Sequence, residues 1–132
     1  MTNASTRQFP FARWVFTAAA WYGFLVMAPQ YFLEAKLGRD YPPPITHPEN
    51  YYGFIGVTLA WQLLFFVIGR DPIRYRGAMI PAVVEKATFA IAIAVLYAKG
   101  RVASALLPFG GIDLLLGTLF VVSYLKTPAR DA

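Results

Sequence analysis

Three ionisable residues stand inside long apolar stretches of this 132-residue sequence. Glu85 and Lys86 are adjacent in one stretch, and Asp113 lies in the next. A charged side chain at the centre of a membrane helix costs about 2.5–3.5 kcal/mol on insertion scales, so such residues face the bundle interior and find partners there. Two carboxyl groups beside one ammonium can form an ion pair, bind a ligand or exchange a proton.

The depths of these residues predict which side chains meet, because an α-helix rises about 1.5 Å per residue. Measured from one end of the predicted bundle, Lys86 lies at about 12 Å and Asp113 at about 18 Å. An extended lysine side chain spans that difference, which predicts a Lys86–Asp113 ion pair. Glu85 and Gln62 share a depth of about 10 Å, which predicts a hydrogen bond between them. Tyr22 reaches a similar layer and completes the predicted polar core.

Helical periodicity places Asp113 on an inward face. At about 100° per residue, Asp113 shares that face with Gly110, Gly117, Phe120 and Tyr124. Glycines on both sides of an aspartate let a neighbouring helix approach closely, as small residues do in membrane bundles. The preceding apolar stretch has a matching wedge, which consists of Ala82, Glu85, Lys86 and Phe89.

The cluster of charges has two interpretations. It is either a buried structural network that fixes the register of the helices or a site for a ligand or a proton. The residues leave both open. Trp21 and Trp61 are predicted to pack in the bundle, with the walls of a hydrophobic pocket as the alternative.

No metal site is predicted. His47 is the single histidine, the sequence has no cysteine, and one histidine with Glu49 cannot complete a zinc site. We therefore interpret His47 as a solvated loop residue. The sequence has no glycine-rich phosphate loop, nucleophile elbow or haem-ligand pair, and no cofactor is predicted.

The elements that position these residues follow from composition. Hydrophobic residues make up 58% and charged residues 14% of the chain, against about 45–50% and 25% in soluble domains. This composition excludes a soluble enzyme, a disordered protein and a disulfide scaffold. Four apolar stretches have the roughly 20 residues that a membrane helix needs. They cover residues 14–33, 51–69, 78–98 and 102–125.

The predicted fold is all-α: an antiparallel, up-down bundle of four transmembrane helices in one integral membrane domain, residues 1–132. The first stretch is predicted to be retained rather than cleaved, because the apolar run before its alanines is too short for a signal peptide. Four prolines predict an extended connector over residues 41–48. The link at residues 99–101 is so short that the last two helices must form an antiparallel hairpin.

Basic residues predict the orientation. Seven lysines and arginines fall on the side of the two chain ends, including Arg7 and the loop at residues 70–76, and four fall on the other side. The excess predicts that both termini face the cytoplasm, in a cell (inner) membrane. The arginines of the loop are predicted to touch anionic headgroups, and their small number argues against nucleic-acid binding.

The layout resembles that of the DoxX-like group, which consists of small four-helix bacterial membrane proteins. The similar parts are Gly53-Phe54-Ile55-Gly56 at the start of one span and the hairpin from Glu85 to Leu125. The likeness covers most of the chain in layout and carries over no functional residue. The resemblance implies association with a larger membrane or redox complex. The small multidrug resistance transporters are similar in length, but their essential glutamate lies in the first helix, and residues 14–33 hold no acidic residue.

Three functions follow as hypotheses. The first is an accessory or structural protein of the membrane, with a membrane-protein partner or a second copy of the chain as its neighbour. The second is a binder or transporter of a small lipophilic or cationic molecule that uses Glu85, Lys86 and Asp113. The third is an enzyme acting on a lipid or quinone, with Glu85 or Asp113 as acid or base. No complete catalytic set is visible in the sequence, which argues against the enzyme.

Overall fold

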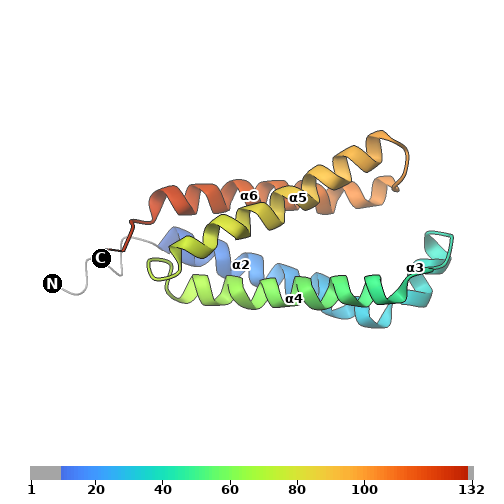
Figure 1. Ribbon diagram of the computed structural model, residues 1–132, viewed down its shortest axis with the longest axis horizontal. Coiled ribbons are helices and arrows are strands. Elements are labelled where there is room, and N and C mark those ends of the chain that lie inside the picture. Colours follow the sequence, from blue (N-terminus) through green and yellow to red (C-terminus); the bar gives the residue numbers. More distant parts are fainter. Residues whose placement is uncertain (1–9, 131–132) are drawn as a thin grey trace.

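The structure of the protein is a computed structural model that describes residues 10–130. The described chain is 82% helical, with five α-helices and no strand. Figure 1 labels these helices, which are α2 (Pro10–Met27), α3 (Glu34–Asp40), α4 (Pro48–Arg70), α5 (Met79–Ala98) and α6 (Leu107–Lys126). The predicted all-α four-helix bundle is confirmed, with α3 as a short fifth helix.

Four helical segments are long and apolar enough to cross a membrane. With their flanking 3₁₀ turns, these segments are Phe11–Phe32, Pro48–Arg70, Arg76–Ala98 and Ser104–Lys126. Each overlaps one of the four predicted stretches. The chain is therefore a multi-pass membrane protein.

Prolines account for most differences between predicted and observed helix ends. Helix α4 begins at Pro48, three residues before the predicted stretch and at the last residue of the predicted connector. Proline suits the first turn of a helix, where its missing N–H group has no helical partner. The rest of the connector, residues 41–47, is non-helical, as predicted, but it bends at residues 41–43 and 46 and is not extended throughout. In the first span, α2 ends at Met27 and continues as a 3₁₀ turn that contains Pro29.

Helix α3 was not expected from the sequence. It begins directly after the first span. Glu34 is in its first turn, where a carboxylate stabilises the helix by interacting with the positive end of the helix dipole. Lys36 and Asp40 form an ion pair one turn apart on its surface. The helix ends at Asp40 because Tyr41 precedes a proline, and that position disfavours helical dihedral angles.

The link between α5 and α6 depends on one glycine. Gly100 has a φ of 68°, a left-handed conformation that glycine adopts without steric cost. The amide of Gly100 donates to the carbonyl of Tyr97 at 2.9 Å, and the amide of Arg101 donates to that of Leu96 at 2.8 Å. This pair of bonds is a Schellman motif, which ends α5 and turns the chain back. The predicted hairpin of α5 and α6 is confirmed, with α6 beginning later than residue 102.

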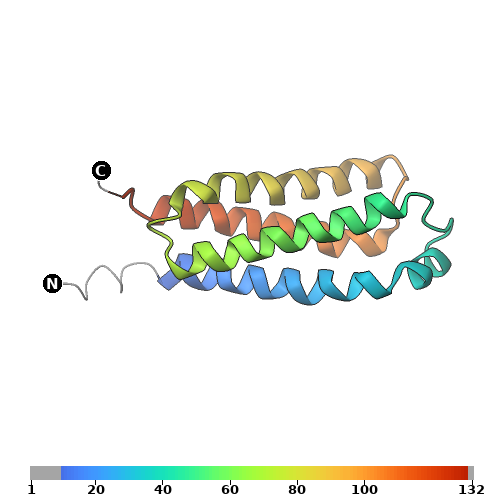
Figure 2. The same ribbon diagram turned by 60° about the horizontal axis from the view of Figure 1, so that its bottom comes forward.

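The bundle consists of two hairpins. Helix α2 packs along α4, and α5 packs along α6; the hairpins meet through α2 and α6, whereas α4 and α5 make few contacts. Figures 1 and 2 show that α2 begins and α6 ends at the same end of the bundle, here called the terminal end. The opposite end, which holds α3 and the α5–α6 link, is called the distal end. In Figure 1 the two hairpins lie close together at the terminal end and diverge toward the distal end.

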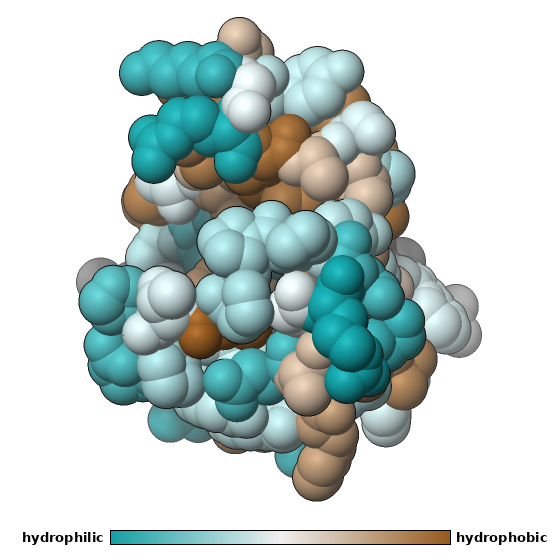
Figure 3. Space-filling model, turned by 90° about the vertical axis from the view of Figure 1, so that its right-hand side faces the viewer, coloured by the Kyte–Doolittle hydropathy of each residue, from teal (hydrophilic) through white to brown (hydrophobic). Residues whose placement is uncertain are grey.

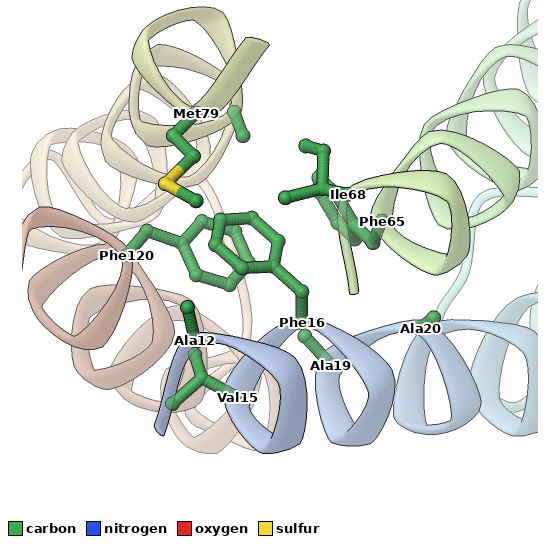
Figure 4. Packing of buried hydrophobic residues seen from close by; sticks show 10 residues of the cluster. Ala12, Val15, Phe16, Ala19, Ala20, Phe65, Ile68, Met79 and Phe120 are labelled. Atoms are coloured by element: carbon green, nitrogen blue, oxygen red, sulfur yellow. The ribbon is translucent and has the colours of Figure 1, made fainter. Parts of the chain in front are cut away.

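An aromatic cluster holds the hairpins together in the terminal half (Figure 4). Phe16 of α2 stacks on Phe120 of α6, with ring centroids 4.2 Å apart. Phe65 of α4 meets both rings edge-on, at 6.0 and 5.1 Å. Met79 of α5 is also fully buried in this cluster. The cluster therefore contains residues from all four long helices. Because these large side chains lie on one side of the polar core, they close the bundle only in its terminal half.

Arg76 ties the loop between α4 and α5 to the end of α6. Its Nε donates to the carbonyls of Thr127 at 2.6 Å and Tyr124 at 3.3 Å, and its guanidinium lies 3.8 Å from the centroid of the Tyr124 ring. These carbonyls are in the last turn of α6 and just beyond it, where the helix lacks its own donors. Arg76 therefore caps the end of α6, a role that the sequence did not predict. Arg7, which was counted in the basic excess, lies outside the described residues.

Candidate functional site

Lys86 and Asp113 form an ion pair between α5 and α6. The distance between Lys86 Nζ and Asp113 Oδ1 is 3.3 Å, and both side chains are buried. The predicted pair is confirmed. Lys86 Nζ also lies 5.5 Å from the centroid of the Phe65 ring on α4, within range of a cation–π interaction. The lysine therefore lies directly on the distal side of the aromatic cluster.

Small residues of α6 make this pairing possible. A Cβ atom at Gly117 would lie 3.3 Å from Lys86 Cβ, and one at Gly110 would lie 3.0 Å from Ile93 Cγ2. Glycine at these positions lets α6 approach α5 closely, one turn before and one turn after Asp113. The predicted inward face of this helix is confirmed, since Gly110, Asp113, Gly117 and Phe120 are all buried and Tyr124 is half-buried.

Glu85 has a weaker attachment to the pair. Its Oε2 atom lies 3.6 Å from Lys86 Nζ, beyond hydrogen-bond distance, and has no hydrogen-bond partner among the described residues. Its side chain is 17% exposed, against 4% for Lys86 and 11% for Asp113. Lys86 is therefore closer to Asp113 than to Glu85, and Glu85 is a second carboxylate at the edge of the pair.

The predicted hydrogen bond between Glu85 and Gln62 is wrong. Gln62 is fully buried, and its Nε2 donates to the carbonyl of Thr58 one turn earlier in α4, at 2.9 Å. Its Oε1 has no partner among the described residues. The carboxamide lies over Gly23 of α2, which has no side chain to displace it. Equal depth was not sufficient, because Gln62 turns toward its own hairpin while α4 and α5 diverge.

The charges lie at one end of a cavity of about 1440 Å³ between the hairpins. Glu85, Lys86 and Asp113 line its inner end, together with Gln62 and the half-buried Tyr22, so all five predicted polar-core residues border the same space. Its walls are mostly apolar and include Phe54, Val57, Trp61, Phe89, Ile93 and Phe109. The aromatic cluster lies outside the lining. The cavity therefore runs from the polar core toward the distal end.

Two aromatic rings bridge the diverging helices beside this cavity. Phe54 of α4 and Phe89 of α5 stack with centroids 6.4 Å apart. Of the two deep tryptophans, Trp61 lines the cavity, whereas Trp21 is 57% exposed and packs edge-on against Phe66. The pocket-wall alternative thus holds for Trp61 alone.

Sequence reasoning missed the residues at the mouth of the cavity. Leu33, Lys36, Leu37 and Asp40 line it from α3 and the residue before it, at helical spacing. Part of the proline-rich connector and Arg101 of the α5–α6 link also line it. Two pairs spaced one helical turn apart, Leu33 with Leu37 and Lys36 with Asp40, were a detectable signal for a helix here. Figure 3 shows this distal end, where hydrophobic surface is visible between hydrophilic side chains.

The described residues hold no group of three or more acidic, histidine or cysteine side chains placed to bind a metal ion. His47 is exposed and lies 3.3 Å from Glu49 Oε1. Comparison with protein-family models, curated proteins and solved structures finds no match to this chain. The chemistry of the site is a buried ion pair, a spare carboxylate and an apolar cavity that reaches both.

Proposed function

We propose that this protein binds a small lipophilic molecule within the membrane, in the cavity between the two hairpins. One observation carries the proposal: the same cavity is lined by apolar and aromatic side chains and by all three intramembrane charges. Ligand sites commonly combine apolar walls with a few convergent polar groups. The polar head of the molecule lies against Glu85 and Asp113, and its apolar body lies along α4 and α5.

The size of the cavity fits an amphipathic molecule. Ligand pockets typically measure about 300–1,000 Å³, and this cavity exceeds that range because it opens toward the distal end. From Lys86 to the end of α5 at Ala98 the helix rises roughly 18 Å. That length accommodates an alkyl chain of a dozen carbons or a fused ring system.

A purely structural role for the three charges is the rival explanation. The Lys86–Asp113 pair alone would set the register of α5 against α6. Such a pair needs neither a bordering cavity nor Glu85. The accessory role in a larger membrane or redox complex and the lipid- or quinone-directed enzyme draw on no separate feature of residues 10–130. Binding is therefore the function that accounts for most of the site.

The proposed location is the cell (inner) membrane, with the terminal end of the bundle in the cytoplasm. Among the described residues, Arg13, Arg70, Arg74, Arg76, Lys126 and Arg130 belong to the terminal end. Lys36, Arg39, Lys99 and Arg101 belong to the distal end. The excess of basic residues favours the cytoplasmic side for the terminal end. In this orientation the cavity opens toward the outer surface.

Photolabelling tests the binding proposal. The purified protein in phosphatidylcholine nanodiscs is irradiated with dodecyl probes that carry a diazirine in the chain and either an amine or a hydroxyl head. We expect saturable labelling of wall residues such as Trp61 and Phe89, with at least one of the two heads. Unsaturable labelling confined to lipid-facing residues such as Leu25 and Leu114 would overturn the proposal.

Two threonines provide a matched pair of variants. Thr88 and Thr118 are both exposed, and each donates its hydroxyl to a carbonyl one turn earlier, at 2.8 and 2.9 Å. Only Thr88 lines the cavity. We expect Thr88→Trp to fill part of the cavity and reduce saturable labelling several-fold, while Thr118→Trp leaves it unchanged. Equal labelling of the two variants would contradict the proposal.

A further inference from the structure

We infer that the head group bound in this cavity is a protonated primary or secondary amine, with Glu85 as its counter-ion. The inference rests on the proposed binding function and specifies its ligand class. Two features of the polar core lead to it: the count of charges and the supply of hydrogen-bond acceptors.

Two carboxylates share one ammonium, because Lys86 forms ion pairs with both Asp113 and Glu85. Lys86 Nζ is within hydrogen-bond distance of Asp113, at 3.3 Å, while Glu85 Oε2 is 3.6 Å away. Two carboxylates and one ammonium carry one formal negative charge in excess. Glu85 is the most exposed of the three and lines the cavity, so the excess charge is accessible to a ligand. A positively charged head would complete the site, and an anionic head would be repelled.

No other basic residue of the described chain can neutralise Glu85 from within the cavity. Lys36 and Arg101 line the cavity, but both belong to its distal mouth. Arg101 follows the end of α5, which lies roughly 20 Å along the helix axis from Glu85. Lys36 is already paired with Asp40. Among residues 10–130, Lys86 is thus the one cation beside Glu85, and it is shared with Asp113, so a second cation would have to come from a ligand.

Hydrogen bonding narrows the class of cation. The two buried side-chain atoms without a hydrogen-bond partner in the described chain are Gln62 Oε1 and Glu85 Oε2, and both are acceptors. Gln62 is fully buried with its carboxamide over Gly23 of α2, and one of its two Nε2 hydrogens is donated to the Thr58 carbonyl, so Glu85 is the acceptor that a head group in the cavity can reach. Buried acceptors are normally paired with a donor. A carboxylate can turn about its terminal bond, so Glu85 can present either oxygen to a donor in the cavity.

The possible head groups differ in how well they match the charge and the acceptor of Glu85. A protonated amine brings a positive charge and two or three N–H donors, which matches both features. A trimethylammonium head brings the charge and could rest on aromatic walls such as Trp61 and Phe89, but it has no N–H group. An alcohol brings one donor without the charge. Of these three heads, the protonated amine alone satisfies Glu85 in both respects.

A head-group series tests the inference on the unmodified protein. Dodecylamine, dodecyltrimethylammonium, dodecanol and dodecanoate compete against the photoreactive dodecyl probe that labels the cavity, with protein-free nanodiscs correcting for partition into lipid. We expect dodecylamine to compete about tenfold better than each of the others, the scale of one charge-assisted hydrogen bond. Equal competition by dodecyltrimethylammonium or dodecanol would overturn the inference.

Two acid-to-amide variants assign the effect to one carboxylate. Glu85→Gln removes the proposed counter-ion, and Asp40→Asn removes an exposed acid at the mouth of the same cavity. We expect Glu85→Gln to abolish the preference for dodecylamine over dodecanol and Asp40→Asn to retain it. A preference that survives Glu85→Gln would overturn the inference even though binding itself stands. Absence of saturable labelling with every head group would instead overturn the proposed function.

Discussion

Gln62 of α4 and Gly23 of α2 occupy one shared space in the first hairpin. A Cβ atom at position 23 would overlap the Gln62 carboxamide, and even the Gln62 Cγ atom would be only 2.7 Å from it. The absence of a side chain at Gly23 thus allows Gln62 to be fully buried between the helices. The space at Gly23 lets the carboxamide turn toward α2. For this reason Gln62 does not form a hydrogen bond with Glu85.

Gly23→Ala should displace the Gln62 side chain and break its bond to the Thr58 carbonyl. We expect the free energy of unfolding to fall by about 1 kcal/mol, the usual contribution of one hydrogen bond. Gly53→Ala is the control, because a Cβ atom there would meet nothing within 4 Å. Thermal unfolding of the purified variants would measure both. Equal stability of Gly23→Ala and Gly53→Ala would contradict the shared space.

Lys86 and Asp113 should behave as a coupled pair. Lys86→Ala or Asp113→Asn alone leaves a buried group without its partner, which typically costs about 3–5 kcal/mol, whereas removing both groups can be nearly neutral. We therefore expect the double variant to recover much of the loss, as a double-mutant cycle would measure. If the two single losses in free energy of unfolding simply add in the double variant, Lys86 and Asp113 do not interact.

The same double variant separates a structural pair from a binding site. If the charges serve only to position α5 against α6, the refolded double variant keeps every other property of the protein. Under the proposed function it is folded but its saturable labelling by the hydroxyl-headed dodecyl probe is reduced, because two polar side chains that line the inner end of the cavity are lost, while Glu85 still provides the counter-ion for an amine head. The photolabelling assay and the melting temperature are read on the same sample.

Phe120→Ala should be among the most destabilising single changes in the chain. Phe120 is fully buried and contacts both Phe16 and Phe65, so its loss opens a cavity where the two hairpins join. We expect a loss of about 3–5 kcal/mol, as for other buried aromatic residues. Leu114→Ala, at a 62% exposed position of the same helix, should have little effect. Similar melting temperatures for the two variants would contradict the cluster as the main junction.

The proposed orientation predicts the behaviour of reporter fusions. Fusions after Lys36 and after Lys99 should report the outer (periplasmic) side, and fusions after Arg76 should report the cytoplasm. The reverse pattern would overturn the orientation while keeping four spans. A mixed pattern would contradict the number of membrane crossings.

The sequence was enough to predict the four long helices and the Lys86–Asp113 pair. A membrane helix must satisfy its backbone hydrogen bonds internally, so runs of about 20 apolar residues leave little alternative. The short link around Gly100 then forces α5 and α6 side by side, and depth along two adjacent antiparallel helices becomes a distance in space. Lys86 and Asp113 lie on those two helices, which is why simple arithmetic placed them together.

Glu85 and Gln62 lie on different hairpins, and there the same arithmetic failed. The angle between the hairpins depends on where bulky side chains gather, and Phe16, Phe65 and Phe120 gather only in the terminal half. Phe16, Phe65 and Phe120 come from three different helices. The apolar periodicity of a single helix therefore does not predict that they form one cluster. The cavity and the side chains that line it follow from that angle, so they emerged only when the helices were packed together.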